Sequence, residues 1–180
     1  MKLNIHLVYC IAIIMVVLSL SGCVGNDGIK GTMSGVNAAE IVSVEDAYGF
    51  EFLGQRELTG EEVSRQYVEV SGLVEGAEGL YQADGVDFYI HAMEFASDSE
   101  AEDFVGQYMA TFKPLQSGER FTEESFNEHS ATRISTSTTR NGKQVARYHY
   151  IWSNEHFVIV VGGNTADPAD IMDLAEATGY

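Results

Sequence analysis

The strongest indication of the fold is the run 131-ATRISTSTTRNGKQVARYHYIWSNEHFVIVVGG-163. Asn141-Gly142 is a favoured pair for the tip of a tight hairpin, and Asn154-Glu155 is a candidate second turn. The segments between them predict three antiparallel strands at residues 131–139, 144–153 and 156–162. The run HFVIVV is apolar on both faces, which predicts a central strand. The run ISTST carries hydroxyls on both faces, which predicts an edge strand.

A second hairpin is predicted upstream, in GLYQADGVDFYIHAMEF (79–95), where Asp84-Gly85 is the tip. A helix over residues 97–113 follows it. Ser97 and Glu100 match a capping box, in which each side chain satisfies the other residue's backbone amide. Apolar residues then recur at helical spacing, which predicts one buried stripe.

The end of the chain predicts another helix. Asp167 is a good N-cap, Pro168 suits the first helical position, and Gly179 suits the position just past the end. A short helix after Thr59 is a third candidate, because Thr59 and Glu62 repeat the capping-box pattern. The chain at that point could instead lead straight into a strand.

These elements predict an α+β fold: an antiparallel sheet of about five or more strands with two main helices packed on it. The order along the chain is strand–strand–helix, then strand–strand–strand–helix. Helices on both faces of the sheet would resemble a Mog1/PsbP-type α-β-α sandwich. Helices on one face would resemble a ferredoxin-like layer, and the residues leave both arrangements open.

The amino terminus predicts a secretory signal. Lys2 is followed by the apolar run LVYCIAIIMVVLSL (7–20), which contains Cys10. As a helix this run spans about 21 Å, shorter than the ~30 Å hydrocarbon core of a bilayer. A basic start, a short apolar centre and small residues afterwards are typical of a cleaved signal peptide. An uncleaved amino-terminal anchor is the alternative.

The residues Leu20-Ser21-Gly22-Cys23 resemble the lipobox of prokaryotic lipoproteins, and the continuation Cys-Val-Gly resembles that of archaeal surface lipoproteins. The resemblance implies lipidation of Cys23, cleavage before it, and a position on the outer face of the cytoplasmic membrane. We therefore expect a signal peptide at 1–22, the lipidated cysteine and a flexible, glycine-rich tether at 23–37, and a single domain at 38–180.

The chain is strongly acidic, with 27 acidic and 10 basic residues and a net charge of −17. Such a surface repels polyanions, so nucleic acid is excluded as a partner. The charge is uneven, because no basic residue lies between Arg65 and Lys113. From Lys113 to Arg147 basic residues outnumber acidic ones. This second zone could form a basic patch for an anionic ligand or an acidic partner.

Three aromatic side chains, Tyr148, Tyr150 and Trp152, fall on one face of a predicted strand. Aromatic residues at this spacing most often form core beneath a helix. If that face is open, the row is a stacking platform for a sugar, a peptide or a flat ligand, with Arg147 and Arg133 as donors at its rim.

The histidines give a weaker indication of a metal site. Asn-Glu-His occurs twice, ending at His129 and His156, and His149 lies on the neighbouring strand. With Glu128 and Glu155 these are possible zinc or copper ligands. The spacing argues against such a site: a turn at 154–155 pairs His156 with Ser153 and leaves His149 too far along the ladder. Asn-Glu-His is also ordinary turn composition.

No motif for a hydrolytic nucleophile, a calcium loop or a phosphate loop is present. The sequence therefore favours a membrane-anchored extracytoplasmic lipoprotein with a non-catalytic ligand- or partner-binding domain and no cofactor. Its expected partners are the membrane, through the lipid on Cys23, and another protein of the membrane or cell surface. The alternatives are a metal-assisted hydrolase on the cell surface and a purely structural envelope component.

Overall fold

A computed structural model describes Met33, residues 35–45 and residues 47–180. The predicted signal peptide, including Cys10, and Cys23 lie outside these residues. The strands are β1 (Glu51–Glu57), β2 (Leu73–Ala83), β3 (Val86–Phe95), β4 (Phe121–Phe126), β5 (His129–Arg140), β6 (Lys143–Asn154) and β7 (Phe157–Gly163). The helices are α2 (Ala38–Ile41), α3 (Gly60–Gln66), α4 (Asp98–Ala110) and α5 (Pro168–Ala177).

The seven strands form one antiparallel sheet in the order β1-β2-β3-β7-β6-β5-β4. The α+β prediction is confirmed. Strand β7 occupies the centre of the sheet, and its residues 157–161 are fully buried. This confirms the interpretation of HFVIVV as a central strand, because only a strand covered on both faces places consecutive apolar side chains in the core.

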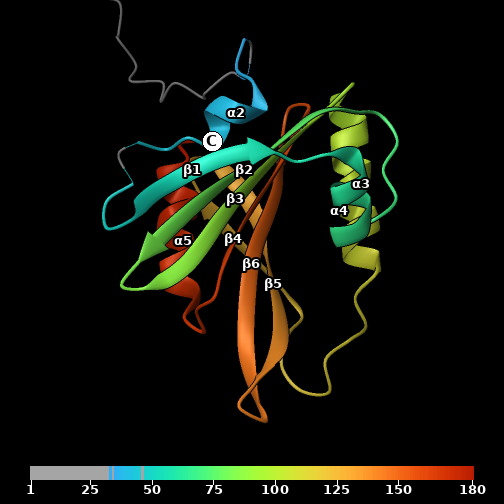
Figure 1. Cartoon of the computed structure of the whole chain (residues 1–180). Coiled ribbons are helices and arrows are strands. Elements are labelled where there is room, and N and C mark those ends of the chain that lie inside the picture. The colour runs from blue at the N-terminus through green and yellow to red at the C-terminus, as the bar shows by residue number, and fades with distance from the viewer. Residues whose placement is uncertain (1–32, 34, 46) are drawn as a thin grey trace, which may run out of the picture. The chain divides into compact units, whose positions relative to one another are not determined.

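Helices cover both faces of the sheet (Figure 1). On one face, α2 and α5 pack on alternate residues of the strands, including Ile159 of β7. On the other face, α3 and α4 pack on the intervening residues, including Val158 and Val160. Of the two arrangements that the sequence left open, the helices adopt the two-sided one.

Three hairpin tips have two residues with positive φ, as a type I′ turn requires: Asp84-Gly85, Asn127-Glu128 and Asn141-Gly142. The first and third were predicted. The last hairpin differs slightly from the prediction, because Asn154 pairs with Phe157 and the turn is Glu155-His156. The predicted pairing shifts by two positions, which leaves every side chain on the face that the sequence gives it.

The outer strands differ most from the prediction. β1 and β4 are the two edges of the sheet, and neither was among the predicted strands. The ISTST segment was predicted to be an edge, but the first half of β5 pairs with β4 up to Ile134. From Ser135 to Arg140, β5 pairs with β6 alone. The edge prediction is thus correct for the hydroxyl-rich half of the strand and wrong for the strand as a whole.

The packed domain reaches further toward the amino terminus than residue 38. Met33 is fully buried in the core beneath α2 and α5, and Asn37 caps α2 through a reciprocal capping box with Glu40. No helix within the described residues is long and apolar enough to cross a membrane.

Candidate functional site

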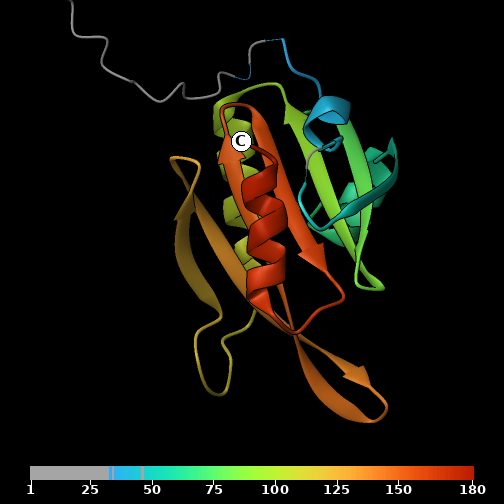
Figure 2. The same cartoon turned by 90° about the vertical axis from the view of Figure 1, so that its left-hand side faces the viewer.

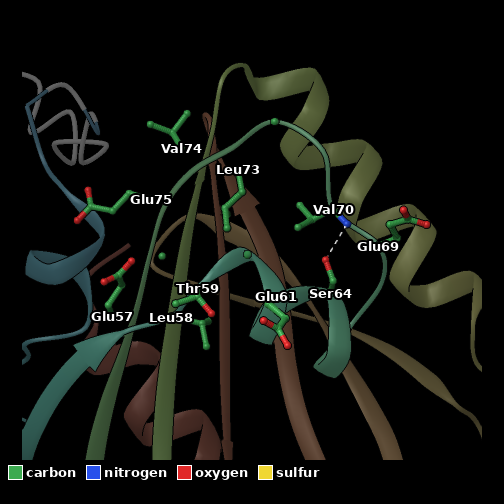
Figure 3. A pocket seen from close by; sticks show the side chains of 13 residues that line it. Glu57, Leu58, Thr59, Glu61, Ser64, Glu69, Val70, Leu73, Val74 and Glu75 are labelled. Atoms are coloured by element: carbon green, nitrogen blue, oxygen red, sulfur yellow. Dashed lines mark hydrogen bonds between the residues drawn. The ribbon is translucent and has the colours of Figure 1, made fainter.

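A cleft of about 700 Å³ lies between α3 and the chain from Glu69 to Gly76 (Figure 3). It opens where β1 ends and β2 begins. The lining residues are Glu57, Leu58, Thr59, Gly60, Glu61, Ser64, Glu69, Val70, Gly72, Leu73, Val74, Glu75 and Gly76. A cavity of this volume is in the range of small-ligand sites in proteins.

Local interactions of the chain hold the cleft in shape. Thr59 begins α3 with the predicted capping box, in which its hydroxyl accepts from the Glu62 amide and Glu62 accepts from the Thr59 amide. The hydroxyl of Ser64, on the same helix, accepts a hydrogen bond from the amide of Val70 at 3.2 Å. This bond ties the far wall of the cleft to α3.

The floor requires a close approach of two strands. The amide of Leu58 donates to the carbonyl of Gly76 at 2.9 Å. A Cβ atom at position 76 would lie 2.4 Å from the carbonyl oxygen of Leu58, which is closer than side-chain carbons come to other atoms. Only glycine fits position 76 without a shift of the backbone.

The cleft is acidic and partly apolar. Its four carboxylates belong to Glu57, Glu61, Glu69 and Glu75, all exposed, and none of its lining side chains is basic. Figure 3 shows the apolar side chains of Leu73 and Val70 toward the middle of the cleft and the carboxylates around its margin. Such a lining suits a cation that also carries an apolar group.

Arg56, which directly precedes the lining residue Glu57, is engaged by carboxylates outside the cleft. Its guanidinium lies 2.7 Å from Oε1 of Glu62 and 2.5 Å from Oε2 of Glu78, neither of which lines the cleft. The hydrogen bonds from Thr59 and Arg56 lower the pKa of Glu62 to about 2. The charge of Arg56 is therefore already engaged by two carboxylates.

A series of hydrogen-bonded side chains continues from Glu78 into the core through His91 and Tyr67. His91 lies directly opposite Glu78 on β3, and its Nε2 is 2.9 Å from Oε1 of Glu78. A carboxylate only accepts hydrogen bonds, so Nε2 carries a hydrogen, and in neutral His91 the Nδ1 atom accepts from the hydroxyl of Tyr67. The hydrogen bond from His91 lowers the pKa of Glu78, and burial raises the pKa of Tyr67 well above its ordinary value.

The Glu78–His91–Tyr67 hydrogen-bond series supports the cleft but does not line it. His91 is 3% exposed, and neither it nor Tyr67 lines the cleft. Tyr67 comes immediately after α3, at the start of the segment that forms the cleft's far wall. The bond from Tyr67 to His91 therefore fixes that wall to the sheet.

A second buried tyrosine–histidine pair lies on the same face of the sheet. The hydroxyl of Tyr108 on α4 is 3.2 Å from Nε2 of His149 on β6. Burial, with a smaller contribution from the charge of His91, lowers the pKa of His149 to about 4. His149 is thus neutral at physiological pH and packs as core.

The predicted aromatic row does not form an open face. Tyr150 and Trp152 are each 1% exposed and belong to the core beneath α5, where Phe126 contacts Trp152 edge to face. The other possibility that the sequence offered, core beneath a helix, is the arrangement found. Tyr148 is half-buried and is covered by the guanidinium of Arg133, 5.6 Å from the ring centroid.

The two arginines expected at the rim of that row lie apart. Arg133 makes an ion pair with Glu124 at 2.5 Å, on the face that carries Tyr148. Arg147 projects from the opposite face of β6, donates to the carbonyl of Ala146 at 2.9 Å, and lines a separate hollow of about 350 Å³ with Arg140. The structure therefore does not assemble the five predicted ligand-binding residues into one site.

The three histidines considered as metal ligands are also separated. His149 is buried against Tyr108. His156 is in the β6–β7 turn, where its Nε2 is 3.8 Å from Oε1 of Glu94. His129 begins β5 after the Asn127-Glu128 turn. Among the residues that the structure describes, no group of three or more histidine, cysteine or acidic side chains could hold a metal ion.

Part of the signal for the cleft is present in the amino-acid sequence. The chain between Arg65 and Lys113 has no basic residue, and Glu69 and Glu75 belong to that zone. Their proximity to Glu57 and Glu61 depends on the pairing of β1 with β2, and β1 was not predicted.

No protein-family model matches the chain, and a search of curated proteins finds no match.

Proposed function

We propose that this chain is a membrane-anchored extracytoplasmic lipoprotein whose domain binds a ligand without transforming it. The ligand that fits best is a cation with an apolar group, such as an amine or a lysine- or arginine-bearing peptide end. The observation that carries the proposal is the cleft, which has four exposed carboxylates around apolar side chains and no basic residue.

The placement of the histidines supports binding rather than turnover. General acid–base catalysis most often uses a histidine within hydrogen-bond reach of the substrate, and none lines the cleft. The Glu78–His91–Tyr67 hydrogen-bond series contains a histidine beside a carboxylate, but His91 is buried and none of the three residues lines the cleft. A ligand in the cleft meets carboxylates, hydroxyls and apolar side chains.

The anchor is supported by the sequence alone. The Leu20-Ser21-Gly22-Cys23 motif and the apolar run before it are the basis for lipidation at Cys23 and for a position on the outer face of the cytoplasmic membrane. A lipid anchor would keep the cleft at the cell surface, where it would meet ligands or partner proteins from outside.

A binding screen with the protein purified from membranes in detergent tests the proposal. The probes are polyamines, lysine- and arginine-containing dipeptide amides, and alkyl quaternary ammonium ions, measured by isothermal titration calorimetry. We expect saturable binding that weakens as salt is added, because exposed charge pairs are screened.

A matched pair of variants locates the binding. The double variant Glu57→Gln/Glu75→Gln should weaken the best probe by about tenfold. The double variant Glu102→Gln/Glu119→Gln removes the same charge from exposed positions outside the cleft and should leave the affinity unchanged. An equal loss of affinity in both double variants would show that binding depends on the net charge of the protein and not on the cleft. Absence of saturable binding by any probe would contradict the proposal and favour a structural envelope component.

A further inference from the structure

The β5–β6 hairpin extends beyond both of its neighbours in the sheet. β4 pairs with β5 only as far as Ile134, and β7 pairs with β6 only as far as His149. Residues 135–148 therefore form a two-stranded ribbon, which we call the arm (Figure 2). Residues 137–144 are all exposed.

The arm has a cationic face and a neutral face. Directly opposed residues of an antiparallel pair lie on the same side of the sheet. The pairs Arg140–Lys143 and Thr136–Arg147 therefore place all three of the arm's cations on one face. The opposite face carries Ser135, Ser137, Thr139, Gln144, Ala146 and Tyr148.

The outer edge of the arm is open. The amide of Ser135 donates to the carbonyl of Arg120 at 2.8 Å, on the side of β5 away from β6. Successive amides of a strand point to alternate sides, so those of Ser137 and Thr139 point the same way. No strand of the described residues pairs with the arm on that side.

The charge of the hairpin is opposite to that of the chain. The segment 129–154 has four basic residues and no acidic one, although the whole chain has a net charge of −17. Two such arms would repel each other, which opposes symmetrical edge-to-edge pairing between copies. The same cations attract an acidic strand.

We propose that the arm binds an extended acidic segment of a partner protein, which adds as a strand to the open edge of β5. The backbone amides and carbonyls of Ser137 and Thr139 hold the segment, and Arg140 and Lys143 select acidic side chains on one of its faces, whereas Arg147 is engaged by the carbonyls of Ala146 and Thr165. The open edge favours a peptide over an anionic lipid surface, because lipid headgroups use the cations but not the row of backbone groups. This site is separate from the cleft and goes beyond the proposed function.

Selection from a phage-displayed library of random peptides, with the full chain in detergent as bait, tests this proposal. The recovered peptides should have an excess of Asp and Glu alternating with β-branched or aromatic residues, as an added strand requires. Recovery of peptides without an acidic excess, or of none above background, would overturn it.

Variants then test the geometry with the best recovered peptide. Arg140→Glu/Lys143→Glu should weaken binding by about tenfold or more, whereas Arg65→Glu/Lys113→Glu makes the same charge change outside the arm and should weaken it less. Ser137→Pro removes an outward amide that the β5–β6 ladder does not use, so it should also abolish binding. Ser137→Ala keeps that amide and should bind normally. Unchanged binding by Ser137→Pro would overturn strand addition.

Other occupants of the arm give distinct results. Arm-dependent binding to vesicles of mixed neutral and anionic phospholipid, with no peptide binding, would overturn the proposal in favour of a membrane contact. Self-association in sedimentation that the Arg140→Glu/Lys143→Glu variant abolishes would overturn it in favour of a second copy. Thermal unfolding of each variant, expected within a few degrees of the wild type, verifies that the fold is retained.

Discussion

Glu78 and His91 are directly opposed on β2 and β3, with Oε1 of Glu78 2.9 Å from Nε2 of His91. Through Tyr67, which bonds the other ring nitrogen, this pair connects the second strand of the sheet to the end of α3. His91 is buried and Glu78 is partly buried, and neither lines the acidic cleft. The integrity of this pair should therefore affect both stability and the far wall of the cleft.

Replacement of Glu78 tests this connection. Glu78→Gln leaves His91 and Arg56 without their shared carboxylate and should lower the free energy of unfolding by about 2 kcal/mol. Urea denaturation at neutral pH measures the change. Glu119→Gln, at an exposed position, should stay within about 0.5 kcal/mol of the wild type. If Glu78→Gln and the wild type were equally stable, the contacts of Glu78 with His91 and Arg56 would contribute nothing to the free energy of unfolding.

His149 predicts a loss of stability in mild acid. Its pKa is lowered from 6.5 to about 4, so between these values the unfolded chain binds a proton that the folded chain does not. The free energy of unfolding should fall by up to about 3 kcal/mol as the pH drops from 6.5 to 4, and the effect should saturate below that. His149→Gln should lack this component in urea titrations at a series of pH values. His156→Gln, at the β6–β7 turn, should retain it.

Two glycines predict opposite effects of the same substitution. Gly76→Ala brings a Cβ atom to 2.4 Å from the Leu58 carbonyl oxygen and should destabilise the fold by about 1–3 kcal/mol. Gly106→Ala, on α4, places the Cβ in open space and should stabilise the fold by about 0.5–1 kcal/mol, because alanine favours the helix. Thermal unfolding measures both. If both substitutions changed the stability in the same direction, the close approach of Gly76 to the carbonyl oxygen of Leu58 would be contradicted.

The proposed lipid anchor predicts a defined mass and a defined first residue of the native protein. Intact-protein mass spectrometry of membrane-purified material should find a chain that begins at a lipid-modified Cys23. Cys23→Ser should lose the lipid and the processing, whereas Cys10→Ser should retain both, since Cys10 belongs to the segment that we propose is removed. Detection of unprocessed Met1 in the native protein, or of an unmodified Cys23, would contradict the anchor.

The local signals of the sequence predicted the centre of the sheet and the helices well. Asp84-Gly85 and Asn141-Gly142 form the expected tight turns, because only residues that tolerate positive φ fit there. The caps at Thr59 and Asp167 are formed as the sequence indicates. Ser97 caps α4 by accepting from the amide of Glu100, which is the predicted half of the box that the structure retains.

The edge strands were missed because their residues do not alternate. β1 has a bulge between Phe52 and Gly54, and Gly54 has a φ of +139°. In β4, Glu123 bonds Ser130 and Thr132, while its neighbour Glu124 bonds Arg133 and therefore serves the other face. Strands that are polar on both faces lack the period-two pattern on which sequence prediction depends.

The candidate site could not be predicted, because it depends on these missed elements. The cleft brings Glu57 beside Glu75 only after β1 pairs with β2. The aromatic row was correctly placed on one face of a strand, but whether a helix covers that face is a tertiary question. Burial of Tyr150 and Trp152 beneath α5 answers it.

The most direct test of ligand binding in the acidic cleft is a two-dimensional NMR titration of the isotope-labelled protein with the tightest cationic probe. Binding in the cleft should produce saturable shifts of amide signals confined to the residues around it, from Glu57 to Gly76, with no change in the arm. Shifts concentrated elsewhere in the domain, or shifts that persist unchanged in Glu57→Gln/Glu75→Gln, would contradict it.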